Sequence, residues 1–182
     1  LTSLDLSKIS TKNVERMDYM FINCIGLTNL DLSSFDTSNV VNLGSMFFNC
    51  ESLTSINLSK FNTEKVTSMT DMFNGCSSIK TLSLDSFKTD LVASMDQMFA
   101  GCSSLAILNI STFTTPNLED ADRMFSDCSE LNLLEFNFTS EKLHRAEQMF
   151  KGCSQLTKVD LSGMSGELIE DLSEMFAGCY SL

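Results

Sequence analysis

Cysteines are the residues of this chain whose type and spacing most suggest chemistry. Each closes the same short motif, Met-Phe-x-x-Cys, and successive motifs lie 26 residues apart except for one step of 25. A cysteine thiolate can act as a nucleophile, ligate a metal or form a disulfide. The seven positions are Cys24, Cys50, Cys76, Cys102, Cys128, Cys153 and Cys179. Their regular spacing means that the chemistry of these thiols depends on the repeat that positions them.

The repeat favours buried, reduced thiols. Equivalent side chains of stacked repeats point the same way, and both this parallel direction and the odd count disfavour disulfides. Neighbouring Cα atoms about 5 Å apart are still close enough for a bridge, so some bridging remains an alternative. Metal binding is a weaker alternative, because the chain has no Cys-x-x-Cys motif and a single histidine. Free cysteine is commonly a buried core residue, and we expect that role here.

No other residues form a catalytic pattern. The one histidine, His144, has no nucleophile at a recognisable spacing, and we expect it on the surface between Glu119 and Glu170 of adjoining repeats. There is no phosphate-binding glycine loop. Asp120, Arg145 and Asp171 also occupy equivalent positions and predict weak ion pairs between repeats. The sequence therefore predicts no enzyme activity and no cofactor.

Each repeat predicts one strand and one helix, as residues 27–52 illustrate. Leu30 and Leu32 alternate with polar residues, which is typical of a half-buried strand. Apolar residues from Val40 to Cys50 follow at steps of three, three, one and three, the spacing of one helix face. A hydroxyl residue stands where it would cap that helix, at Thr11, Thr37, Thr63, Thr89, Thr115 and Ser140. Before each cysteine stands a residue that tolerates the left-handed conformation, namely Asn23, Asn49, Gly75, Gly101, Asp127, Gly152 and Gly178.

A supersecondary unit at this period, repeated along the whole chain, predicts a single α/β solenoid domain over residues 1–182. We expect the strands to form one parallel sheet and each coil to add a short helix. Coils one to seven are residues 1–26, 27–52, 53–78, 79–104, 105–130, 131–155 and 156–181. The chain begins and ends at the first position of a unit, so we expect a fragment of a longer array whose uncovered ends favour end-to-end self-association.

The repeat resembles that of the BspA-like leucine-rich repeat surface proteins, especially the variant of bacterial and mycoplasma-type lipoproteins. The resemblance rests on the pattern L-x-x-L-x-L-S-x-F-x-T followed by V-x-x-M-x-x-M-F-x-G-C-S-S. This resemblance covers the whole chain. It implies a leucine-rich-repeat fold and suggests cell-surface display with adhesion or host-protein binding. It implies no catalytic residue. Coil six departs from the pattern by one missing residue, and coil seven by Gly163 and Gly166 and the lack of a capping threonine.

Charge narrows the classes of partner. The chain carries 24 acidic and 12 basic residues, a net charge of −12, which repels nucleic acid and anionic membranes. No apolar stretch is long enough for a transmembrane span. Asp5, Asp31 and Asn57 form a column that could suggest calcium, but no glycine-aspartate calcium loop accompanies it.

The exposed side of the sheet is the expected working surface, and we expect it to be the concave wall of the solenoid. Its outward positions are mostly small and polar, with Ile107 and Leu133 as the exception in adjoining coils. Exposed apolar side chains with a polar rim are typical of a protein-binding spot. The predicted site is Ser83, Ile107, Asn109, Leu133, Glu135 and Lys158.

The sequence thus predicts a non-enzymatic repeat module that binds a protein, such as a host or matrix protein, at the cell surface or outside the cell. The alternative is a cytoplasmic structural scaffold or assembly protein, which free thiols would also fit.

Overall fold

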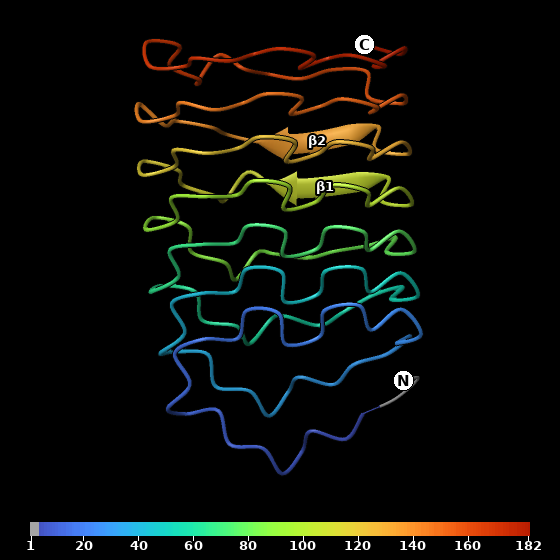
Figure 1. The fold of residues 1–182 in the computed structure, drawn as a ribbon, viewed down its shortest axis with the longest axis vertical. Helices are drawn as coiled ribbons and strands as arrows, with labels where there is room; N and C mark the ends of the chain where they lie inside the picture. The colour runs from blue at the N-terminus through green and yellow to red at the C-terminus, as the bar shows by residue number, and fades with distance from the viewer. Residues whose placement is uncertain (1–3) are drawn as a thin grey trace.

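The protein is a stack of seven coils with its termini at opposite ends (Figure 1). The structure is a computed structural model and describes residues 4–182. Backbone hydrogen bonds join residues 25 positions apart, as from Met17 N–H to Asn42 C=O and from Leu43 N–H to Ser68 C=O. The coils therefore stack at the period of the sequence repeat. Within residues 4–182, no helix has the length and apolar character needed to cross a membrane.

The expected helices are wrong, because the structure has no helix within residues 4–182. In coil two the segment from Leu43 to Cys50 is a series of tight turns. The N–H of Met46 donates to Leu43 C=O at 3.2 Å, and the N–H of Cys50 to Phe47 C=O at 3.0 Å. The N–H of Phe48 likewise donates within the coil, to Ser45 C=O, but the alternate N–H groups of Ser45 and Phe47 donate to the next coil. These alternate groups therefore cannot form the bonds along a helix axis that an α-helix requires.

These turn segments form a continuous wall, which we call the Met-Phe wall. In coil two, four alternate N–H groups donate to carbonyls of coil three at 2.7–3.2 Å. The donors are Leu43, Ser45, Phe47 and Asn49, and the acceptors are Ser68, Thr70, Met72 and Asn74. The same four bonds recur between each pair of coils from one to six. The N–H groups of this wall thus alternate between bonds within the coil and bonds to the next coil.

Each turn segment of the Met-Phe wall contains two residues with a left-handed backbone conformation. The residue before each cysteine has a positive φ, as the sequence predicts; Asn49 has φ 56° and Gly75 has φ 74°. Four residues earlier lies a second positive-φ position, occupied by Tyr19, Ser45, Asp71, Gln97, Arg123, Gln148 and Glu174. The sequence did not indicate this second column, because its residue types share no preference for positive φ.

The threonines that the sequence predicted as helix caps instead form hydrogen bonds between neighbouring coils. The Thr63 side chain is fully buried, and its Oγ1 donates to Lys88 C=O at 2.8 Å. The same oxygen accepts the N–H of Lys88 at 2.7 Å. Thr11, Thr37 and Thr89 make the equivalent pair of bonds to the next coil. Each of these threonines therefore satisfies a backbone donor and a backbone acceptor of its neighbour.

The predicted sheet is confirmed only in part. Strands β1 (Ile107–Ile110) and β2 (Leu133–Phe136) pair in parallel, and the structure has no other strand within residues 4–182. Aspartate, asparagine and serine are common at the outward positions of the other coils, and these residues have low strand propensity. The apolar residues predicted to point inward do so, since Leu27, Leu30 and Leu32 are all buried.

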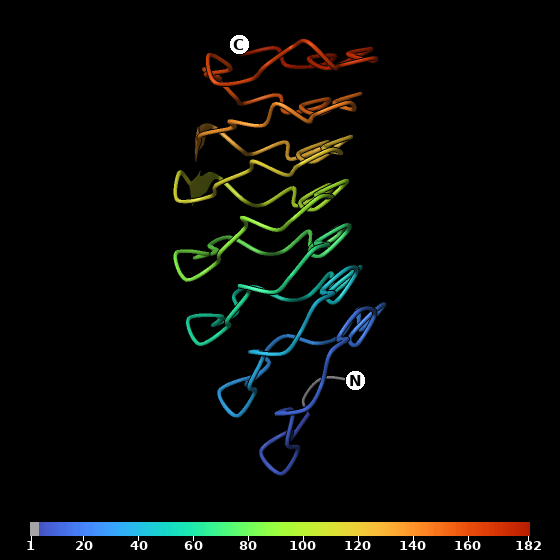
Figure 2. The same cartoon turned by 90° about the vertical axis from the view of Figure 1, so that its left-hand side faces the viewer.

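The stack is fan-shaped. Figure 2 shows the coils close together on the side of the Met-Phe wall and spread apart on the side of β1 and β2. The closer side has hydrogen bonds of the Met-Phe wall at every step, whereas the strand side has few backbone bonds between coils. The strand face therefore lies on the outer side of the fan, and the expectation that it is a concave wall is wrong.

The core lies between the two faces. Phe21, Phe47, Phe73, Phe99, Phe125, Phe150 and Phe176 stack in one column with ring centroids 5.4–5.9 Å apart. Val40, Leu43 and Met46 of coil two are fully buried beside this column. Each coil therefore covers apolar surface of the next, which is how repeat proteins gain stability.

Coil six interrupts these columns where its one residue is missing. Ser140 Oγ donates to Leu118 C=O at 2.6 Å, so the hydroxyl ladder does not continue into coil seven there. Gly163 of coil seven lies against coil six, where a Cβ atom would be 2.4 Å from Phe138 O. The departures seen in the sequence thus coincide with a local repacking between coils six and seven.

We predict that Thr63→Val lowers the unfolding free energy by about 1–3 kcal/mol. The substitution leaves the N–H and C=O of Lys88 without the Thr63 hydroxyl, and a buried unpaired polar group costs about this much. Urea unfolding followed by circular dichroism measures the change. Thr81→Val is the control, because Thr81 is exposed. Equal midpoints for the two variants would show that the hydroxyl column does not hold the coils together.

Candidate functional site

Ile107 and Leu133 form an exposed apolar ridge on the strand face. They are register partners in the β1–β2 pair, and their exposed fractions are 57% and 46%. The predicted adjacency of these side chains is therefore confirmed. Their neighbours in the strands, Leu108 and Leu134, point inward and are buried. Stacking does not require the outward pair to be apolar.

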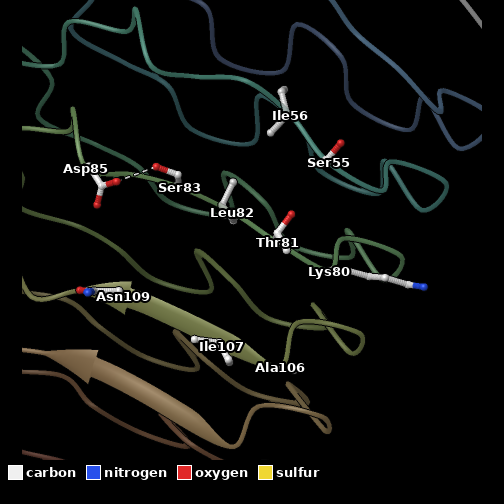
Figure 3. A pocket seen from close by; sticks show the side chains of 10 residues that line it. All are labelled: Ser55, Ile56, Lys80, Thr81, Leu82, Ser83, Asp85, Ala106, Ile107 and Asn109. Atoms are coloured by element: carbon white, nitrogen blue, oxygen red, sulfur yellow. Dashed lines mark hydrogen bonds between the residues drawn. The ribbon is translucent and has the colours of Figure 1, made fainter.

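A hollow of about 630 Å³ lies on one side of this ridge, between coils three, four and five. Figure 3 shows it with Lys80 at one end and Asp85 and Asn109 at the other. Its apolar residues include Ile56, Leu82 and Ile107. The hollow occurs where coils four and five lack strand pairing, so it is a direct result of the fan shape.

A second hollow of about 350 Å³ lies on the other side of the ridge, against coils six and seven. The six predicted site residues divide between the two hollows. Ser83, Ile107 and Asn109 line the first, and Leu133, Glu135 and Lys158 line the second. The structure thus places these residues as two separate groups, on either side of the ridge.

The predicted site omitted seven of the ten residues that line the first hollow, among them Ile56, Lys80 and Asp85. Ile56 is half-buried rather than fully inward, and Lys80 and Asp85 are exposed at its two ends. Ser83 Oγ donates to Asp85 Oδ2 at 2.9 Å, shown as the dashed line in Figure 3. The opposite charges of Lys80 and Asp85, five residues apart, were the signal available in the sequence.

The column of aspartates and asparagines has a structural role at the ends of the strand segments. Asp31 Oδ1 accepts the N–H of Ser33 at 2.8 Å, and Asn109 Oδ1 accepts the N–H of Ser111 at 3.0 Å. Hydrogen bonds from the Ser33 side chain and backbone lower the pKa of Asp31. These oxygens close turns, and within residues 4–182 no group of three or more acidic, cysteine or histidine side chains is arranged to hold a metal ion.

The columns expected around His144 and Arg145 are confirmed in the stacking, but within residues 4–182 Arg145 makes no ion pair with Asp171. The His144 N–H donates to Glu119 C=O, and the Glu170 N–H donates to His144 C=O, both at 3.0 Å. The Arg145 guanidinium lies 3.4 Å from Asp120 and also pairs with the buried carboxylate of Asp122. These contacts join coils five to seven and form no nucleophile–base pair.

The thiols are free, and five of the seven are buried. Each sulfur from Cys50 to Cys179 donates to a phenylalanine carbonyl of the preceding coil at 3.0–3.3 Å. Burial raises the pKa of Cys50 to about 12, with a smaller contribution from Cys24. A thiol of this kind is a poor nucleophile. The core position predicted for the cysteines is therefore confirmed for the buried five.

Asp96 is an acidic group in an unfavourable position on the Met-Phe wall. Its Oδ1 is buried and has no hydrogen-bond partner within residues 4–182, while Gln97 donates to its Oδ2 at 3.3 Å. Burial raises the pKa of Asp96 to about 6, and the charges of Asp120, Asp71 and Asp122 add to this effect.

Known proteins identify the family. The chain matches the family described as "Mycoplasma protein of unknown function, DUF285" over residues 2–105 and 49–163. The chain belongs to the DUF285 family. No curated protein matches it.

Solved structures establish the fold of this DUF285 chain. A leucine-rich repeat protein from Eubacterium ventriosum matches with a TM-score of 0.56 at 23% identity, over 88% of this chain and 39% of that one. One from Bacteroides ovatus matches with a TM-score of 0.41 at 25% identity, over 75% of this chain and 43% of that one. A leucine-rich cell surface protein from Faecalibacterium prausnitzii matches with a TM-score of 0.39 at 19% identity, over 91% of this chain and 61% of that one.

The DUF285 chain therefore has a leucine-rich-repeat fold, and its resemblance to BspA-like leucine-rich repeat proteins is confirmed. It spans less than two thirds of each of these three structures. Leucine-rich repeat proteins are typically non-enzymatic and bind other proteins or ligands. The similarity establishes the fold of this chain and leaves its partner to be inferred from its own surface.

We predict that the native DUF285 chain reacts with a thiol reagent mainly at Cys24 and Cys179, which are only half-buried. The other five thiols are protonated and covered, so their reaction requires the stack to open. After denaturation all seven cysteines should react. Ellman's reagent, with mass spectrometry to locate the label, measures this. Substantially fewer than seven equivalents in denaturant would show that some cysteines are bridged.

We predict that Asp96→Asn raises the unfolding free energy at pH 7.5 by about 1 kcal/mol, after allowance for solvent screening. The native pKa near 6 exceeds the ordinary aspartate value of 3.8, so the native state binds the proton more tightly. Wild-type stability should accordingly fall as the pH rises from about 4 to 6, and the variant should have a smaller slope, to which Asp71 still contributes because burial raises its pKa as well. Urea midpoints across that range measure it. The control Glu64→Gln, at an exposed carboxylate, should keep the wild-type slope.

Proposed function

We propose that this chain is a non-enzymatic binding module that uses its strand face to bind a protein ligand. The observation that carries the proposal is the exposed ridge of Ile107 and Leu133 between two hollows. Large exposed apolar side chains with a polar rim are typical of protein-binding spots. Ser83, Asn109, Glu135 and Lys158 supply that rim.

The chemistry of this face favours modest affinity. No tryptophan is present in the chain, and neither tyrosine lies on the strand face, so the usual aromatic hot-spot residues are missing there. Burial of the Ile107 and Leu133 side chains would supply most of the binding free energy, and the polar rim would set the orientation of the ligand. The net charge of −12 favours protein surfaces over nucleic acid as partners.

We propose that the module is displayed at the cell surface as an adhesin for host or matrix proteins. This rests on the BspA-like resemblance. The alternative, a cytoplasmic scaffold with end-to-end self-association, is favoured by the seven free thiols, which suit a reducing compartment. The full-length gene distinguishes them. A signal peptide with a lipobox or wall anchor supports display, whereas a cytoplasmic reading frame supports the scaffold.

We predict that Ile107→Ser combined with Leu133→Ser weakens binding to a matrix protein by about 5- to 150-fold while the chain stays folded. Both side chains are half-exposed, so their loss should cost little stability. Biolayer interferometry against purified fibronectin, laminin and collagen measures the affinity, and circular dichroism measures folding.

The matched control is Leu91→Ser combined with Leu168→Ser, which removes two exposed leucines that line neither hollow. This control should bind like the wild type. Equal weakening in both double variants, or wild-type binding in both, would place the working surface elsewhere. If the wild type binds none of the three matrix proteins, the adhesin proposal fails for this class of partner.

A further inference from the structure

The first hollow has opposite charges at its two ends and an apolar middle. Lys80 and Asp85 lie at its ends in Figure 3, with Leu82 and Ile107 along the space between them. Neither charged residue takes part in an ion pair within residues 4–182. Five residues of extended chain separate them, which corresponds to about 17 Å.

Backbone groups beside the hollow are also unpaired. The Ala106 carbonyl accepts the Asn132 N–H at 2.9 Å, so it faces coil six. Successive peptide groups of a strand point to opposite sides, so the backbone groups of Ile107 and Asn109 face coil four. No backbone hydrogen bond joins β1 to coil four in the described part of the chain. The hollow therefore offers hydrogen-bonding groups as well as an apolar floor.

We infer that this hollow binds an extended peptide segment with an acidic side chain at the Lys80 end, an apolar side chain against Leu82 and Ile107, and a basic side chain at the Asp85 end. This inference deepens the proposed function and rests on it, because it assigns the bound part of the protein ligand. An extended segment of six residues matches the distance between the two charges, and a peptide with both charges pairs with both ends.

The second hollow is less suited to this role. Lys158 and Asp160 are only two residues apart in coil seven, and Glu135 of coil six lines the same hollow. Its charges therefore compensate one another within one short region. The separated charges of the first hollow give a partner segment a preferred direction.

Two capped peptides test the inference, acetyl-ESLLSK-amide and acetyl-KSLLSE-amide. They have the same composition and a symmetrical interior, and differ only in which end carries each charge. Titration of isotope-labelled protein, followed by NMR at the methyl groups of Leu82 and Ile107, measures each affinity. We expect one peptide to bind about fivefold more tightly than the other, from two partly exposed charge pairs.

The double variant Lys80→Glu with Asp85→Lys should reverse the preference between the two peptides. The control variant Lys88→Glu with Glu64→Lys exchanges two exposed charges that line neither hollow, and it should keep the wild-type preference. Equal binding of both peptides, no binding of either, or a preference unchanged by the Lys80 and Asp85 exchange would overturn the inference.

The peptide test and the matrix-protein test can fail independently of each other. If the Ile107 and Leu133 double variant loses its matrix partner but neither peptide shows a preferred direction, the strand face remains the docking surface and the extended-segment mode fails. If the peptides obey the charge exchange but the double variant keeps its matrix partner, the hollow binds peptides and the ridge is not the adhesive surface.

Discussion

The structure depends on one constraint, the pairing of the Met-Phe wall between coils. Alternate N–H groups of this wall donate to the next coil at each step of the stack, as those of Leu43, Ser45 and Phe47 do. This pairing holds adjacent coils at the spacing of hydrogen-bonded strands, although the segments themselves are turns. Once the spacing is set, identical residues of successive coils come into contact. The stacked phenylalanines, the threonine ties and the cysteine-to-carbonyl contacts all follow from it.

The same constraint explains the shape of the strand face. The Met-Phe wall is paired at each step of the stack, whereas within residues 4–182 only β1 and β2 form strands on the opposite face, so the coils spread apart there. The spread opens hollows that a closely paired sheet would not have. Ile107 and Leu133 lie where β1 and β2, the only strand pair in the described part of the chain, close this face, with a hollow on each side. The binding surface that we propose is therefore produced by uneven pairing of the two faces.

Stacking also limits which residues can carry function. Cysteine, methionine and phenylalanine recur in every coil because the core needs them, and burial in that core raises the pKa of the thiols. Stacking also brings like charges together on the Met-Phe wall, where the charges of three other aspartates help to raise the pKa of Asp96, after burial as the main cause. Residues that vary between coils, such as Ile107, Lys80 and Asp85, are free of these requirements. Specific recognition is expected to depend on them.

The sequence by itself determined the period, the inward-pointing residues and the adjacency of Ile107 and Leu133, because a regular repeat places equivalent residues in columns. It also indicated the left-handed residue before each cysteine from the preference for Asn, Asp and Gly. It could not distinguish a helix from a series of turns, since both bury residues at steps of three and four. Only the tertiary structure decided this, because the N–H groups of Ser45 and Phe47 find acceptors in the next coil rather than in their own. The second left-handed column and the hollow between Lys80 and Asp85 likewise depend on how neighbouring coils pair, which no single repeat encodes.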